Sequence, residues 1–347
     1  MIRFDCDYLE GAHPLILQRL SETNFEQTIG YGCDPHCENA AKLIKKACNK
    51  NDCDVHFLVG GTQTNTTVIC AALRPHQGVI GADSGHINVH ESGAIESTGH
   101  KVIALPSDDG KISADAVKNC FEAHWNDEAH EHIVQPAMVY ISQPTEKGTL
   151  YSKAELEEIF TVCKKCGLLL YIDGARLGYA LASDGCDMTL ADVAANCDAF
   201  YIGGTKVGAL FGEALIINNE NLKKDFRYLI KQKGGLLAKG RLLGIQFEVL
   251  FENGLYFEIS AHAIKAAKRL RQIFENHGCR FLADSETNQQ FPIMKNEEIA
   301  KLSEKFSFEK WCSVNENETA VRFCSSWATT DENLDALEKA VKNLKYI

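Results

Sequence analysis

Two stretches of this chain decide its fold, LLLYIDGARLGYA (168–180) and YIGGTKVGA (201–209). In the first stretch an apolar run ends in Asp173, and in the second Lys206 lies among small residues. An apolar run that ends in a polar residue is typical of a buried strand, and ligands of α/β sheets bind where such strands end. The spacing of Asp173 and Lys206 fits the C-terminal ends of two strands of one sheet. We therefore expect both side chains at the same edge of the sheet, at the mouth of one ligand site.

An aspartate and a lysine at one mouth are the pair that pyridoxal phosphate chemistry requires. The lysine forms the Schiff base, and the aspartate keeps the pyridine nitrogen protonated so that the ring accepts electrons. Asp173 would sit in a partly dry place and need a cationic partner to stay ionised. A desolvated pocket would lower the pKa of Lys206. The alternatives are an Asp173–Arg176 pair that caps a helix and a surface loop lysine.

Apolar runs alternate with helical patterns from about Val55 onward, which predicts an α/β fold with a mainly parallel seven-stranded sheet buried on both faces. The expected strands are 55–59, 79–83, 101–105, 137–142, 168–173, 199–203 and 214–218. The expected helices between them are 62–73, 113–123, 153–166 and 219–231.

The last third of the chain has a different pattern. Long helices are expected at 238–250 and 260–276, and short strands follow, mixed with helices at 296–305 and 331–343. This pattern predicts a smaller α+β domain. We expect an extended N-terminal segment over 1–30 that packs on the small domain or a partner subunit, a large cofactor-binding domain over 31–235 and the small domain over 236–347.

Composition narrows the functional class. The 347 residues carry 36 basic and 47 acidic side chains, a net charge of −11 that argues against a general nucleic-acid binder. No apolar run approaches the length of a membrane span, and the N-terminus MIRFDCDYLEG lacks a signal-peptide core. We expect a cytoplasmic protein with no membrane partner. Its 14 cysteines, including the pair Cys163 and Cys166, are expected to be free thiols, and no metal site is predicted.

Three further parts of the sequence are suited to binding an anionic, aromatic ligand. Gly61 and Thr62 follow an expected strand and open a helix, where backbone N–H groups and a hydroxyl can hold a phosphate; the alternative is a simple capped turn. His86 follows the strand 79–83 and could stack on a cofactor ring, or it could be an ordinary loop histidine. Arg322 lies in an apolar strand and needs an anion, either a substrate carboxylate or a structural carboxylate.

Taken with these pieces, nearly the whole chain resembles the low-specificity L-threonine aldolases, which belong to the aspartate-aminotransferase-like (fold type I) pyridoxal phosphate enzymes. The matching motifs are FDCDYLEGAHP (4–14), IGYGCDP (29–35), GGTQTN (60–65), GHINVHESGA (85–94), PTEKGTLYS (144–152), YIDGARLGYAL (171–181), YIGGTKVGALFGEAL (201–215), KGGLLAKGRLLGIQFE (233–248) and AVRFCSSWATT (320–330).

The resemblance implies a role for each site residue. Lys206 would carry the cofactor, Asp173 would pair with the pyridine nitrogen and His86 would stack on the ring. Arg176 would sit beside the ring oxygen and could also contact substrate. The remaining roles are phosphate binding by Gly61, Thr62 and Thr205, and substrate binding by Arg322 and Asp7.

The resemblance also implies a homodimer or homotetramer with shared active sites. Tyr31, Lys239 and Arg241 are then candidates to reach a neighbour's cofactor. The chain departs from the family at Cys6-Asp7-Tyr8, where Ser-Asp-Thr is common, and at Gly60, where a serine is common. The second active-site histidine is expected near His132, with His124 and His130 as competitors.

The expected activity is that of an aldehyde-lyase, which cleaves L-threonine, L-allo-threonine or a related β-hydroxy-α-amino acid to glycine and an aldehyde. Lys206 is the expected catalytic lysine, and His86 or His132 would take the β-hydroxyl proton. The same residues could also serve β-elimination, aminotransfer or phenylserine cleavage. A different class, a metal-dependent hydrolase, would use His86, His90 and Glu91. A protein that binds the cofactor without catalysis is a third possibility.

Overall fold

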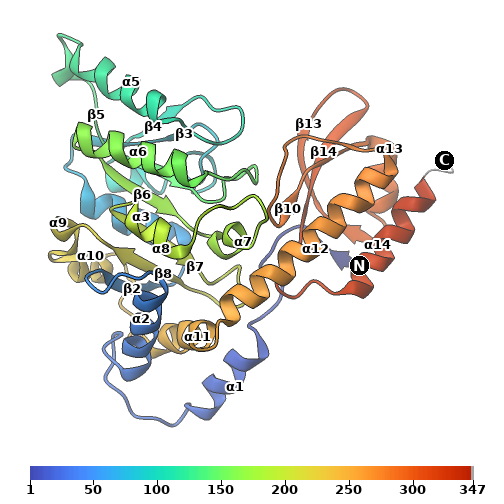
Figure 1. Ribbon diagram of the computed structural model, residues 1–347, viewed down its shortest axis with the longest axis horizontal. Helices are drawn as coiled ribbons and strands as arrows, with labels where there is room; N and C mark the ends of the chain where they lie inside the picture. The colour runs from blue at the N-terminus through green and yellow to red at the C-terminus, as the bar shows by residue number, and fades with distance from the viewer. Residues whose placement is uncertain (345–347) are drawn as a thin grey trace.

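The computed structural model describes residues 1–344 and has two lobes joined by one long helix (Figure 1). That helix, α12 (Leu255–His277), starts against the larger lobe and ends in the smaller one. The chain begins in the smaller lobe, where β1 (Ile2–Arg3) pairs in parallel with β12 (Phe306–Ser307). Residues close to the N-terminus therefore lie beside residues from the last part of the chain.

Within the described chain, the larger lobe is built on one seven-stranded sheet, which confirms the predicted mainly parallel α/β fold. Only β8 runs antiparallel to its two neighbours. The strands in spatial order are β2 (Asp54–Leu58), β8 (Glu213–Ile217), β7 (Ala199–Gly203), β6 (Leu169–Asp173), β5 (Gln135–Ser142), β3 (Gln77–Ala82) and β4 (Val102–Leu105).

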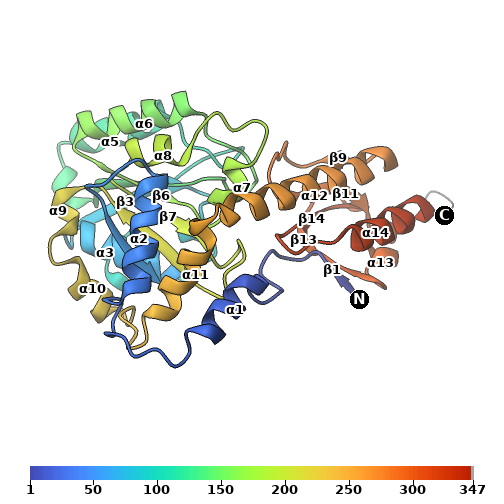
Figure 2. The same cartoon turned by 60° about the horizontal axis from the view of Figure 1, so that its bottom comes forward.

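Side chains alternate between the two faces of this sheet, and helices cover both faces (Figure 2). Ile172 and Phe200 point to one face, and Tyr171 and Tyr201 point to the other. The first face packs against α2 (Pro35–Ala47), α5 (Ala114–Trp125), α6 (Lys153–Cys166), α8 (Leu190–Ala195) and α11 (Arg241–Glu252). The second face packs against α3 (Gly61–Ala72), α9 (Glu220–Lys223) and α10 (Phe226–Gln232).

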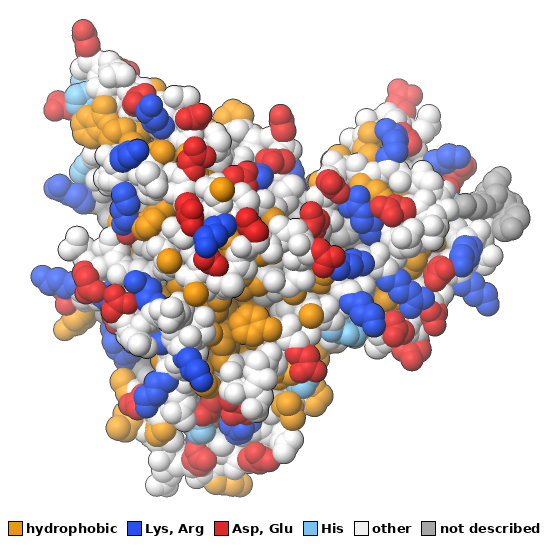
Figure 3. Space-filling model, in the orientation of Figure 1, with side chains coloured by type: hydrophobic (Ala, Val, Ile, Leu, Met, Phe, Trp, Pro, Cys, Tyr) orange, Lys and Arg blue, Asp and Glu red, His pale blue; other side chains and the backbone are white. Residues whose placement is uncertain are grey.

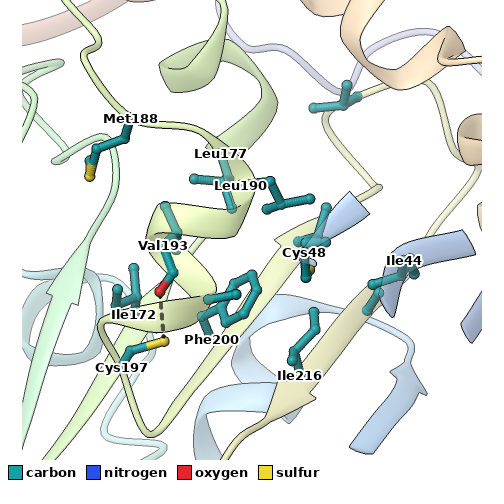
Figure 4. Packing of buried hydrophobic residues seen from close by; sticks show 14 of the residues in the cluster. Ile44, Cys48, Ile172, Leu177, Met188, Leu190, Val193, Cys197, Phe200 and Ile216 are labelled. Carbon is teal, nitrogen blue, oxygen red and sulfur yellow. Dashed lines mark hydrogen bonds between the residues drawn. The ribbon is translucent and has the colours of Figure 1, made fainter. Parts of the chain in front are cut away.

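Figure 4 shows part of the first core, where Cys197 points toward Val193 and its Sγ lies 3.2 Å from the carbonyl oxygen. All 14 cysteines lie within residues 1–344 and all are free, including Cys163 and Cys166 at the end of α6. Burial raises the pKa of Cys163 to about 12. A buried thiol of this kind fills the core as a small apolar side chain.

Helix boundaries follow capping chemistry. The prediction for α6 matches the observed bounds, since Ser152 and Glu155 form a capping box and Gly167 ends the helix at φ +67°. The predicted helix 219–231 is wrong as one element. It is divided into α9 and α10 because Asp225 adopts a positive φ of 59° between them.

The prediction of an extended N-terminal segment is also wrong in part, since α1 (Pro14–Glu22) lies within it. Pro14 occupies the first helical turn, and the His13 side chain accepts a hydrogen bond from Leu15 N. Buried Ile16 anchors α1 against the larger lobe. The segment packs on the small lobe through β1 and Phe4.

The smaller lobe is α+β. Its strands β9 (Arg280–Phe281), β10 (Gln289–Gln290), β11 (Pro292–Lys295), β13 (Glu309–Ser313) and β14 (Glu318–Cys324) pair antiparallel and pack with α13 (Asn296–Leu302) and α14 (Asp331–Leu344). The two cores meet inside α12, where Ile264 belongs to the larger core and Ala266 to the smaller. Helix α11 and the start of α12 therefore pack with the larger lobe, later in the chain than the expected boundary at 235.

On the face that Figure 3 shows, Lys and Arg side chains are interspersed with Asp and Glu side chains over both lobes. No helix among residues 1–344 is both long enough and apolar enough to cross a bilayer.

Candidate active site

A cavity of about 550 Å³ lies at the C-terminal ends of the parallel strands and extends to the smaller lobe. The structure brings together there most of the residues that the sequence singled out. They are Gly61, Thr62, His86, Asp173, Arg176, Thr205, Lys206 and Arg322.

Two glycines bring the loops that carry Asp173 and Lys206 into contact. Gly203 N donates to Gly174 O at 2.9 Å. A Cβ on Gly174 would lie 1.9 Å from Tyr201 O, and a Cβ on Gly203 would lie 2.1 Å from Ala175 O. Larger residues at either position would separate the two loops.

Asp173 ends β6 and is held by donors from three other elements. It accepts hydrogen bonds from Tyr201 Oη at 2.5 Å, Tyr140 Oη at 2.7 Å and Asn65 Nδ2 at 3.2 Å. Burial raises the pKa of Asp173, but the nearby His86 charge and the tyrosine hydrogen bonds outweigh that effect and lower it. The side chain is therefore an ionised carboxylate at the floor of the cavity.

The carboxylate of Glu91 connects this network to His86. Asn65 Nδ2 also donates to Glu91 Oε1 at 2.7 Å, and His86 Nδ1 lies 2.8 Å from the same oxygen. Burial lowers the pKa of His86, but the hydrogen bond to Glu91 and the charge of Asp173 outweigh it, so the net shift is upward. A continuous chain of hydrogen bonds thus runs from Asp173 through Asn65 and Glu91 to His86.

Lys206 lies in the loop between β7 and β8. Burial lowers its pKa, and the Arg176 charge acts in the same direction. A lysine with a lowered pKa holds a neutral, nucleophilic amine for more of the time. Buried Glu213 lies beside it, and burial raises the pKa of that carboxyl to about 8. Glu213 was missed from the sequence, because a carboxyl in the strand pattern EALII carries no local sign of burial.

The residues expected to bind a phosphate lie in two places, at the start of α3 and at Thr205 in the loop after β7. Helix α3 begins at Gly61 with Gly60 as its N-cap, and no side chain caps its first N–H groups. Those groups and Thr62 border the cavity. Thr205 is engaged elsewhere: its Oγ1 donates to Glu213 Oε1 at 3.0 Å and accepts from Gly212 N at 2.9 Å.

Asp7 does not reach the cavity, which corrects its prediction as a substrate contact. It is fully buried, and its oxygens accept from Arg176 Nε at 2.7 Å, Arg176 Nη2 at 3.0 Å and Asn288 Nδ2 at 2.8 Å. The Arg176 fork therefore pairs with Asp7 in both hydrogen bonds, and not with Asp173 as the capping alternative required. The pair ties the N-terminal segment to the floor of the site.

Arg322 reaches the cavity from β14 of the smaller lobe. It forms an ion pair with Glu309, and its Nη1 donates to Gln289 Oε1 at 3.1 Å. The guanidinium carbon lies 5.3 Å from the centroid of the Trp311 ring. Glu309, Gln289 and Trp311 all line the cavity, and none of them was anticipated from the sequence.

His132 is not brought to the site of its own chain, and its prediction as a base there is wrong. It is exposed just before β5, which begins at Gln135, whereas the cavity lies at the other end of that strand. Eight residues of strand span about 26 Å. His124 and His130 lie at the same remote end, with ring centroids 5.8 Å apart.

Glu146 is a cavity residue that the sequence analysis did not single out. It lines the cavity, and its Oε1 accepts from His86 N at 2.9 Å and Ser142 Oγ at 2.7 Å. Burial raises the pKa of Glu146, and the Asp173 charge adds to the rise. The rule that polar residues after a buried strand face a ligand site, applied to PTEKG after β5, would have found it.

The three inter-subunit candidates lie outside the cavity of their own chain. Tyr31 is exposed at φ +60°, with Lys231 Nζ 4.9 Å from its ring centroid, and Lys239 is exposed. Arg241 donates within its own chain to the carbonyls of Thr23, Asn24 and Glu26.

Among residues 1–344, no group of three or more His, Cys, Asp or Glu side chains is arranged to hold a metal ion. His86 and His90 have ring centroids 5.7 Å apart, but Glu91 already accepts from His86 and Asn65. The metal-dependent hydrolase is therefore not favoured.

Comparisons with known proteins agree with this geometry. Residues 13–297 match the model of the family described as beta-eliminating lyase. The chain is 29% identical to a low specificity L-threonine aldolase of a Pseudomonas species, over 98% of this chain and 97% of that protein. The solved structure of Leishmania major threonine aldolase is 47% identical, with a TM-score of 0.96 and 99% of each chain covered.

An aspartate aminotransferase of Thermus thermophilus has a TM-score of 0.72 at 14% identity, covering 99% of this chain and 91% of that one, which bears on the fold alone. The expected fold type I architecture is confirmed by these structural matches.

Proposed function

The chain belongs to the beta-eliminating lyase family, and from that membership and the geometry of its cavity we propose a pyridoxal phosphate-dependent threonine aldolase. It is a carbon–carbon lyase that cleaves L-threonine, or a related β-hydroxy-α-amino acid, to glycine and an aldehyde. The observation that supports this most directly is the joint placement of Lys206, Asp173 and Arg322 around one cavity.

The residues present fit pyridoxal phosphate. Lys206 would offer an amine of lowered pKa to its carbonyl carbon, and Asp173 would offer an ionised carboxylate to its ring nitrogen. The uncapped N–H groups at the start of α3 and the Thr62 hydroxyl suit its phosphate. When bound, the cofactor supplies an electron-accepting ring that stabilises the charge left on Cα when the Cα–Cβ bond breaks.

The remaining steps fall to the protein's own side chains. Arg322 binds the substrate carboxylate and so orients the amino acid in the cavity. His86, held by Glu91, takes the proton from the β-hydroxyl group. Glu146, which keeps its proton to higher pH than an ordinary carboxyl, is the proposed second proton carrier.

Other reactions of the same site are not favoured. The relatives that are 28% or more identical over nearly the whole chain are named threonine aldolases, which argues against aminotransfer or β-elimination as the main activity.

The test is reconstitution with pyridoxal phosphate, followed by the visible absorbance of the lysine imine and assays of glycine from L-threonine and L-allo-threonine. Lys206→Ala should lose both the imine absorbance and glycine formation. Lys147→Ala is the matched control, since Lys147 Nζ donates to the carbonyls of Ser107 and Asp108 and lies outside the cavity lining. An imine band that persists in Lys206→Ala would show that the lysine is wrongly assigned.

We also propose that the enzyme is a homo-oligomer. Tyr8, which borders the cavity, is 55% exposed, and Leu210 is 42% exposed. Phe25 is 93% exposed and Tyr228 is 75% exposed. Burial of these side chains against a second copy of the chain would remove apolar surface from water. Light scattering coupled to gel filtration measures the mass of the assembly, and a monomer would contradict the proposal.

A further inference from the structure

The place that Arg322 offers to a substrate carboxylate is occupied by a carboxylate of the protein itself. Glu309 on β13 forms an ion pair with Arg322 on β14. The two residues are direct partners in the antiparallel register, so their side chains project on the same face of the pair. The register therefore holds a competing anion beside the guanidinium.

The other groups around Arg322 do not compete in this way. Arg322 Nη1 donates to Gln289 Oε1 and Nη2 donates to Asp5 O, at 3.1 and 3.2 Å. Trp311 presents its ring to the guanidinium. These contacts position Arg322 without placing a second negative charge on it.

Two hydrogen-bond donors at this place are left over. Within residues 1–344, buried Arg322 Nε and buried Gln289 Nε2 have no hydrogen-bond partner. Arginine only donates, so the amide oxygen of Gln289 must face it, and this turns the Gln289 N–H₂ group away from Arg322. A buried donor without an acceptor is costly, and both of these belong to residues that line the cavity. Gln289 is fully buried, so its amide supports Arg322 from within the protein, and the guanidinium is the group that meets an incoming carboxylate.

Glu309 is free to leave. Its side chain is 43% exposed, whereas that of Arg322 is 14% exposed. β13 pairs with β14 alone in the described sheet, and its register shifts between Lys310 and Cys312. When Glu309 turns toward solvent it regains water, while Arg322 would stay buried and uncompensated until another carboxylate arrives.

We propose that Glu309 is an internal competitor for the α-carboxylate of the substrate at Arg322. Glu309 thereby weakens the affinity for amino acids and shields the Arg322 charge when the site is empty. The inference rests on the proposed function, because it takes the ligand to be an α-amino acid. The proposed effect of Glu309 is on the affinity for the amino acid, whereas bond cleavage is assigned to other residues.

The test compares Glu309→Gln with Glu316→Gln in the holoenzyme. Glu316 is an exposed residue of the β13–β14 turn and serves as the matched control. Glycine is titrated by the change in visible absorbance, KM and kcat are measured with L-threonine, and 2-aminoethanol provides an amine without a carboxylate. Glu309→Gln should lower the Kd of glycine and the KM of threonine about two- to fivefold, the size of an exposed cross-strand ion pair. kcat and the 2-aminoethanol titration should not change.

Two outcomes separate the inference from its premise. If the wild-type holoenzyme binds glycine and cleaves threonine but Glu309→Gln leaves the Kd of glycine unchanged or raises it, Glu309 positions Arg322 and the competitor role is overturned. If the wild-type protein neither binds glycine nor cleaves threonine, the proposed function fails and the inference fails with it.

Discussion

His86 Nδ1 lies 2.8 Å from Glu91 Oε1, in a contact that holds the imidazole at one edge of the cavity. Glu91 is buried and also accepts from Asn65, so its carboxylate is fixed before any ligand enters. The pair explains how a half-buried histidine can have a raised pKa. It also makes the behaviour of His86 depend on a residue that does not line the cavity.

We expect Glu91→Gln to shift the pH dependence of the reaction. The amide removes the Glu91 charge, which together with that of Asp173 raises the pKa of His86, so the acidic limb of the kcat/KM profile should move to lower pH. kcat should fall on the order of tenfold, because the tautomer and orientation of His86 are less well held. Glu96→Gln, an exposed neighbour, is the control. Superimposable profiles for Glu91→Gln and wild type would contradict the role given to the pair.

Glu146→Gln should lower kcat on the order of a hundredfold with little change in KM. Glutamine keeps the shape and the acceptor for His86 N and Ser142 Oγ, but it cannot carry a proton. Steady-state kinetics with L-threonine provide the measurement, and Lys147→Gln provides a neighbouring control. Unchanged kcat would leave His86 as the proton carrier at this site.

Glu213→Gln should make the cofactor-free protein more stable at neutral and higher pH. The pKa of Glu213 is raised from 4.5 to about 8 in the folded protein, so the folded state binds the extra proton. Its contribution to stability is therefore greatest below pH 4.5 and is lost as the pH rises to about 8. Glutamine has no such dependence.

The gain in Tm from Glu213→Gln should accordingly be small at pH 5 and on the order of a few degrees at pH 8. Thermal unfolding at both values, with Glu316→Gln beside it, is the measurement. A gain that is the same at both values would mean that Glu213 does not titrate in this window.

Asp7→Asn should lower the free energy of unfolding by about 3–5 kcal/mol, because it leaves the buried Arg176 charge without its partner. Both partners of this ion pair are shielded from solvent, with side chains 0% and 13% exposed. Asp5→Asn is the matched control, since Asp5 pairs with Arg3, which is 54% exposed, and should cost less than about 1 kcal/mol. Urea unfolding measures both, and equal losses would show that the pair does not hold the N-terminal segment.

Much of the larger lobe could be predicted because its order is local. Strands such as β6 and β7 are continuous apolar runs, and each ends in the residues that line the cavity. Helix α6 carries its own start and stop signals. The elements of the small lobe were harder to predict, since β9 and β10 are two residues each and depend on their partners in space.

His132 and Glu146 show why the site was only partly predictable. Both flank β5, one before it and one after it, and a family pattern that expects a histidine pointed to the wrong end of the strand. The direction of a parallel strand decides which end faces the ligand. Asp7 was expected to contact substrate but is buried against Arg176 and Asn288. That burial depends on residues up to 281 positions away, which no local pattern reveals.

The fold class and the placement of Asp173 and Lys206 at one cavity could be predicted from the sequence, because apolar runs and the polar residues at their ends are properties of short stretches. The surroundings of these two residues depend on the tertiary structure. The chain of contacts from Asp173 to His86, the Asp7–Arg176 pair and the hold of Glu309 on Arg322 join residues far apart in sequence. Such contacts form when folding brings distant side chains out of water together, and no local pattern records them.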